Sequence, residues 1–118
     1  MAAHAYEKLR VWSDAVAFSK QIYAVTATFP KNEAFGLTSQ MRRCSVSIAS
    51  NIAEGASRNS KKEFHHFIGI ALGSLAELDT QIIIATPEFI GEDTCNDLRH
   101  TIESLRKMLM GLKVTLIG

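Results

Sequence analysis

The chain has 118 residues, of which 47% are hydrophobic and 21% charged, and this argues for one packed domain spanning residues 1–118 rather than for disorder. The formal net charge is only +1, so any binding of nucleic acid has to come from local patches or from several copies brought together. The first residues lack the apolar stretch of a signal peptide, and no uncharged apolar run approaches the roughly 18 residues of a membrane span. We expect a cytoplasmic protein with no membrane partner.

Four segments carry apolar residues at alternating spacings of three and four, which is typical of helices packed nearly parallel or antiparallel. The first runs from Val11 to Phe29 and is ended by Pro30; the second follows Gly36 and runs over 37–52. The third and fourth segments cover 64–85 and 95–116. Short connections make neighbouring helices antiparallel, which predicts an all-α, up-down-up-down four-helix bundle.

Two local signals refine this picture. Ser60 and Glu63 have the spacing of a capping box at the start of the third helix, so the polar residues after Gly55 form a turn. Cys44 and Cys95 fall on the predicted apolar seams, without the spacing of a zinc site, which predicts two buried, reduced thiols.

The third helix is apolar nearly all round. Phe67, Ile70 and Ile84 project away from its seam, while Gly69 and Gly73 form a groove of small residues on another face. A helix of this kind is usually buried on all sides, which a single four-helix bundle cannot achieve. Self-association is the expected consequence, and scattered surface apolar residues are the alternative.

Polar residues form a stripe beside the core on the second helix, and a matching stripe follows on the third. Three interpretations stay open: a hydrogen-bonded network that fixes register or assembly, a site for a ligand or RNA, and an ordinary solvated face. The residues concerned are Gln40, Arg43, Ser47, Asn51, Glu54, Ser74, Glu77 and Gln81.

The most specific sequence motifs are the stretches 37–40 (LTSQ), 47–55 (SIASNIAEG) and 73–77 (GSLAE). They resemble the signature of the four-helix bundle family encoded by intervening sequences in bacterial 23S ribosomal RNA genes, the S23-type ribosomal proteins. The accessory variability proteins of diversity-generating retroelements are similar. The resemblance implies a barrel-like homopentamer and, for the accessory proteins, binding of nucleic acid and of a reverse transcriptase encoded nearby. One departure is Ala49, where the family usually has proline.

No motif indicates catalysis or a cofactor. Glu63 with His66, and Asp97 with His100, have the Glu/Asp-x-x-His spacing of di-iron bundles, but both pairs point away from their helix seams. No Ser/His/Asp or Cys/His arrangement and no phosphate-binding loop is present in the sequence. We expect neither an enzyme nor a metal site.

Basic residues form two groups, a heptad-spaced stripe on the fourth helix and a cluster at the turn between the second and third. In a homo-oligomer, such patches predict weak, sequence-nonspecific binding of RNA or DNA, or of a protein that carries it. The alternative is an assembly or adaptor scaffold with no nucleic-acid role, whose charges only keep it soluble. The residues are Arg99, Arg106 and Lys113 in the stripe and Arg58, Lys61 and Lys62 at the turn.

Overall fold

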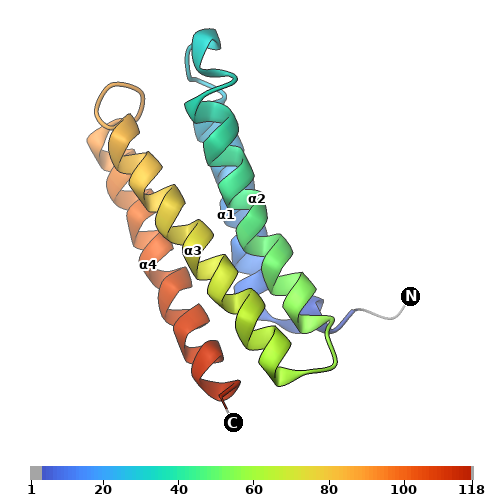
Figure 1. Cartoon of the computed structure of the whole chain (residues 1–118). Helices are drawn as coiled ribbons and strands as arrows, with labels where there is room; N and C mark the ends of the chain where they lie inside the picture. The colour runs from blue at the N-terminus through green and yellow to red at the C-terminus, as the bar shows by residue number, and fades with distance from the viewer. Residues whose placement is uncertain (1–3, 118) are drawn as a thin grey trace.

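A computed structural model describes residues 4–117, and in it the chain folds into four long α-helices (Figure 1). The helices run up and down in chain order, and both termini lie at the end of the bundle that holds the α2–α3 turn (Figure 1). The predicted all-α fold with contacts between consecutive helices is confirmed. In order, the elements are the 3-10 turn η1 (Ala5–Lys8), α1 (Arg10–Thr26), the 3-10 turn η2 (Lys31–Glu33), α2 (Leu37–Ala56), α3 (Lys61–Ala85) and α4 (Glu92–Thr115).

The predicted apolar seams form the core. α2 packs most extensively against α3, and among the helix pairs in contact α1 and α4 share the smallest one. The radius of gyration is 14.8 Å, with extents of 44 × 29 × 20 Å. A typical domain of this length has a radius of about 13.5 Å. The bundle is therefore elongated and thin, with much of each helix near the surface. Its largest fully buried side chains are Phe18, Ile22, Met41, Ile48, Ile52, Ile68, Leu75, Leu78, Ile82, Ile90, Leu98 and Leu105.

The first helix is shorter than predicted. α1 ends at Thr26 rather than continuing to Phe29, because the backbone N–H groups of Thr28 and Phe29 bond three residues back, in a tighter turn that brings the chain to Pro30. The Thr26 hydroxyl donates to the carbonyl of Ile22 at 2.7 Å within the last helical turn. Phe29 still reaches the core, 8% exposed, and its ring centroid lies 5.4 Å from that of Phe89 in the α3–α4 connection. The two connections at this end of the bundle are thus joined.

The turn between α2 and α3 follows half of the predicted capping box. The hydroxyl of Ser60 accepts a hydrogen bond of 3.2 Å from the backbone N–H of Glu63, as expected for the cap of α3. The carboxylate of Glu63 lies instead 3.9 Å from the guanidinium of Arg58. Gly55 is buried in the last turn of α2, and a Cβ there would lie 2.8 Å from Phe64 Cδ1. Only glycine lets the end of α2 approach the start of α3 so closely.

Part of α3 lies on the surface of the single chain. Ile70 is 39% and Ile84 67% exposed, and a Cβ at Gly73 would have no neighbour within 4 Å. α3 is the one helix in residues 4–117 that is long and apolar enough to cross a membrane by length and composition. Its Ile68, Leu75 and Ile82 are nonetheless buried among the other helices, as expected of the central helix of a bundle.

Candidate functional site

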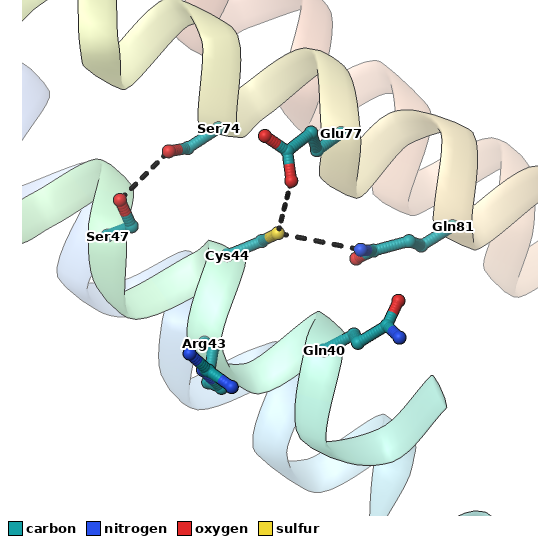
Figure 2. Close-up of a pocket in the computed structure, with 7 residues that line it drawn as sticks. All are labelled: Gln40, Arg43, Cys44, Ser47, Ser74, Glu77 and Gln81. Atoms are coloured by element: carbon teal, nitrogen blue, oxygen red, sulfur yellow. Dashed lines mark hydrogen bonds between the residues drawn. The ribbon is translucent and has the colours of Figure 1, made fainter. Parts of the chain in front are cut away.

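The two predicted polar stripes meet in a groove between α2 and α3, which we call the polar groove (Figure 2). It has a volume of about 420 Å³. The side chains of α2 form one wall and those of α3 the other, because the stripes lie on the facing shoulders of antiparallel neighbours (Figure 2). Its lining residues are Gln40, Arg43, Cys44, Ser47, Ser74, Glu77 and Gln81.

Hydrogen bonds cross the polar groove and join the two helices. The hydroxyls of Ser47 and Ser74 lie 2.8 Å apart, so that one donates to the other. The thiol of Cys44 donates to Glu77 Oε2 at 3.6 Å and accepts from the side-chain amide of Gln81 at 3.5 Å. The dashed lines of Figure 2 show this chain of contacts. The arrangement supports the interpretation of the stripes as a network that holds two helices in register.

Cys44 departs from its predicted place. It was expected to be buried in the core, but it is only half-buried, since its position at the edge of the α2 seam faces the polar residues of α3. Burial raises the pKa of the Cys44 thiol, and the nearby Glu77 carboxylate raises it further, against the lowering effect of the Gln81 hydrogen bond. Cys95 is buried as predicted, and both cysteines are free thiols. The 4, 3, 4 spacing of Gln40, Cys44, Ser47 and Asn51 is the signal that could have placed Cys44 in the stripe.

Asn51 supports the groove from one helical turn away. Its side-chain amide donates to the backbone carbonyl of Ser47 at 2.8 Å and to the hydroxyl of Ser47 at 3.0 Å. This second bond connects Asn51 to Ser74 through Ser47. Glu54, the next member of the predicted stripe, is exposed and pairs with Arg58 at 2.5 Å, outside the groove. The structure therefore brings seven of the eight predicted polar residues together, six as lining and Asn51 as support, and leaves Glu54 aside.

One acceptor in the groove is not satisfied. The Oε1 atom of Gln81 is shielded from solvent and has no hydrogen-bond partner among residues 4–117. A buried polar atom without a partner costs free energy, so the groove of the single chain lacks one donor. Gln40 and Arg43 lie on the α2 wall, and both are exposed.

The basic residues separate into two sets. Three arginines are held by carboxylates of the same chain: Arg58 by Glu54 at 2.5 Å, Arg99 by Asp79 at 2.8 Å and Arg106 by Glu103 at 2.5 Å. The hydrogen bond to Asp79 raises the pKa of Arg99, while the hydrogen bond from Arg106 lowers the pKa of Glu103. Such exposed pairs reduce the positive charge that these arginines present to a polyanion.

The three lysines lie at one end of the bundle, which we call the basic end (Lys61, Lys62 and Lys113). Lys61 and Lys62 begin α3 and line a hollow of about 390 Å³ beside Leu116 and Ile117, the residues that follow α4. Lys113, in the last turn of α4, points its Nζ toward α3, 4.0 Å from where a Cβ of Gly69 would be. None of the ion pairs found within residues 4–117 involves these lysines.

No metal-binding site is found in the part of the chain that the structure describes. No group of three or more His, Cys, Asp and Glu side chains there is arranged to hold a metal ion. His66 lies beside the ring of Phe67, with centroids 5.5 Å apart, and both His66 and His100 are exposed. The site consists of hydrogen-bonding groups between helices, an arrangement suited to packing and binding.

The fold and the polar groove define a class of protein: a small four-helix bundle whose second and third helices are joined by a polar network. The chain belongs to the 23S rRNA-intervening sequence protein family, whose model matches residues 7–111. This confirms the family resemblance of the sequence motifs, and the matched range includes the whole polar groove.

Comparison with solved structures supports the fold. The chain is similar to the crystal structure of a protein of unknown function from the S23 ribosomal protein family of Bacteroides thetaiotaomicron, with a TM-score of 0.79 and 20% sequence identity. The match covers 87% of this chain and 94% of that one. At this identity the likeness shows the shared fold alone. None of the curated proteins matches the chain.

Proposed function

We propose that this protein is a non-enzymatic, self-associating bundle that binds RNA or DNA weakly and without sequence selectivity at its basic end. The observation that carries the proposal is that Lys61 and Lys62 begin α3 beside the residues that follow α4, while Lys113, in the last turn of α4, reaches α3 near Gly69. Ammonium groups that are not neutralised within the chain are the groups that contact phosphates.

The location of Lys61 and Lys62 supports an anionic partner. They occupy the first turn of α3, where the helix dipole is positive and acidic side chains are normally favoured. Positive charge at this point costs stability in the isolated chain, and a phosphate would offset that cost. Phe64 and Phe67, which follow Lys61 and Lys62, are half-buried, so base stacking and sequence selectivity are not expected.

Self-association would place several copies of the basic end in one particle. Three lysines on one chain give a short electrostatic contact, whereas a ring repeats the contact around its circumference. Exposed Ile70, Ile83 and Ile84 on α3 and Val114 on α4 support association, since apolar area of this kind is stabilised by burial between chains. Light scattering after size exclusion is expected to give several chains of 13.0 kDa, five if the family resemblance extends to assembly. A single-chain mass at micromolar concentration would refute self-association.

A second candidate is a scaffold without a nucleic-acid role. The specific observation in its favour is that Arg58, Arg99 and Arg106 already pair with carboxylates on the same chain. In this case the basic residues serve solubility and helix pairing, and a reverse transcriptase or other protein encoded nearby would be the partner.

A fluorescence anisotropy titration at low and moderate salt separates the two candidates. Labelled RNA and DNA of mixed sequence should bind with micromolar affinity, and binding should weaken steeply with salt. The triple variant Lys61→Gln/Lys62→Gln/Lys113→Gln should lower the slope of log affinity against log salt, by up to about 0.9 per lost phosphate contact on duplex DNA. The matched control Arg99→Gln/Arg106→Gln should leave the slope nearly unchanged, because both guanidinium groups are already paired. Absence of binding at low salt by an assembled protein would favour the scaffold.

A further inference from the structure

Phe35 is the most exposed large apolar side chain recorded in residues 4–117, at 99%. The other five phenylalanines, at positions 18, 29, 64, 67 and 89, are buried or half-buried. An aromatic ring can remove about 150–250 Å² of its surface from water when it is buried, so leaving one in solvent forgoes a large contribution. The packing of a single chain therefore does not explain why a phenylalanine is present at position 35.

The turn that carries Phe35 is held in place by backbone hydrogen bonds. The N–H of Glu33 donates to Pro30 at 3.0 Å, that of Ala34 to Lys31 at 3.1 Å, and that of Gly36 to Glu33 at 3.1 Å. These bonds occupy the donors on both sides of Phe35. The ring is thus presented by an ordered turn, which reduces the entropy lost when it docks.

An apolar groove lies elsewhere on the same chain, between α1 and α2, with a volume of about 450 Å³. Tyr23 is 44% and Val46 43% exposed in it, so their apolar surface is available to a partner. The hydroxyls of Ser19 and Ser45 bond across the two helices at 2.9 Å and hold this spacing. The lining residues of this apolar groove are Val16, Ser19, Lys20, Tyr23, Val46, Ala49 and Ser50.

Glu33, beside the ring, and Lys20, beside the apolar groove, carry opposite charges; Lys31 of the same turn is basic. Glu33 lies next to Phe35, with its Oε2 3.4 Å from where a Cβ of Gly36 would be. Lys20 lines the groove, and the guanidinium of Arg42 lies over the ring of Tyr23, 4.7 Å from its centroid. A second copy that inserts its Phe35 brings its Glu33 toward a cationic rim, which selects both partner and orientation.

We propose that Phe35 of one chain inserts into the apolar groove of a second copy, with Glu33 of the first facing Lys20 of the second. This inference rests on the self-association proposed above and names its contact. Because the protruding ring and the groove are different surfaces, the contact is heterologous and repeats from chain to chain, giving a closed ring when the rotation between copies closes.

The first test compares Phe35→Ala with wild type by light scattering after size exclusion. The variant is expected to fall to a single chain of 13.0 kDa while its thermal melting stays that of a folded bundle, since a 99% exposed ring supports nothing within its own chain. Phe35→Tyr keeps the ring and is expected to keep the wild-type mass. An assembled Phe35→Ala would overturn this contact and leave self-association standing, whereas a single-chain wild type would overturn both.

The second test uses the fact that one chain supplies the ring and the other supplies the groove. Val46→Lys puts a charge into the apolar groove but keeps Phe35, while Phe35→Ala keeps the groove. Each variant alone is expected to be a single chain, and an equal mixture should form a two-chain species, because one intact ring meets one intact groove. A mixture that stays monomeric would overturn the heterologous contact.

A third test exchanges two charges, so that the conclusion does not depend on correct folding of Val46→Lys. Lys20 is exposed and Glu33 half-buried in its turn, and Lys20→Glu and Glu33→Lys are each expected to weaken assembly at least several-fold. The double variant Lys20→Glu/Glu33→Lys should recover most of it, with the pair reversed. Equal weakening in the double variant and the singles would show that these two residues do not meet.

Discussion

The hydroxyls of Ser47 on α2 and Ser74 on α3 lie 2.8 Å apart, 27 residues from each other in the sequence. Both side chains are half-buried, and the bond joins α2 and α3, the two helices with the most extensive contact. It is one link of a network that continues to Asn51 through Ser47. The register between α2 and α3 thus depends on short polar side chains as well as on the apolar core.

A double-mutant cycle should measure this link. Ser47→Ala, Ser74→Ala and the double variant are expected to lose stability with a coupling energy of about 0.5–1.5 kcal/mol, because each single change leaves the other hydroxyl without its partner. Urea denaturation followed by circular dichroism gives the four free energies of unfolding. Additive single losses would mean that the two hydroxyls contribute independently.

Substitutions at Asn51 and at Glu54 should differ in their effect on stability, although the two residues are three apart in one motif. Asn51→Leu removes two hydrogen bonds to Ser47 and is expected to cost about 1 kcal/mol. Glu54→Ala removes an exposed pair with Arg58 and should change stability by no more than a few tenths of a kcal/mol. Thermal melts of both variants beside wild type make the comparison, and equal losses would contradict it.

Gly55 should be intolerant of any side chain. Gly55→Ala puts a Cβ 2.8 Å from both Phe64 Cδ1 and Phe67 Cβ, so that the α2–α3 junction must shift. We expect a loss of about 1–3 kcal/mol, the usual cost of overpacking. Gly73→Ala is the matched control, since a Cβ there meets nothing within 4 Å and alanine favours a helix interior by about 0.5–1 kcal/mol. The two substitutions should therefore move the unfolding midpoint in opposite directions.

Cys44 should react slowly with iodoacetamide at neutral pH. The thiolate is the reactive form, and burial together with Glu77 raises the pKa of this thiol, so little thiolate is present near pH 7. The alkylation rate should keep rising through and beyond the ordinary thiol range, about 8.5. Mass spectrometry of peptides separates Cys44 from the buried Cys95, which should react more slowly still. A rate that levels off below pH 8 would contradict the raised pKa.

The same pKa shift predicts how stability depends on pH. A thiol whose pKa is higher in the folded state contributes its stability below the ordinary thiol pKa and loses it as pH rises through the raised value. Stability of the wild type should therefore decline more than that of Cys44→Ser over this alkaline range. Denaturation midpoints at several pH values check the difference.

Local pattern was sufficient to predict the four helices and most of the core. The spacing of apolar residues by three and four depends only on the helical period, so Phe18, Ile48, Leu75 and Leu98 were predicted to be buried, and they are. The same period placed all eight polar residues on two stripes; in the structure six of them line the polar groove, and Asn51 bonds to Ser47 beside it. The shorter α1 is a failure of the same reasoning, because apolar spacing does not register the turn that precedes Pro30.

Which groups pair, and which stay in solvent, was decided by the tertiary structure. Arg99 of α4 pairs with Asp79 of α3, because pairing between helices depends on their rotation and register. Cys44 sits in the groove for the same reason, since a residue at the edge of a seam is buried or exposed according to its neighbour. Phe35 stands in solvent because hydrogen bonds outside the helices set the direction of its turn. The helical period comes from the backbone of each segment alone, whereas these contacts arise only once helices and turns are packed together.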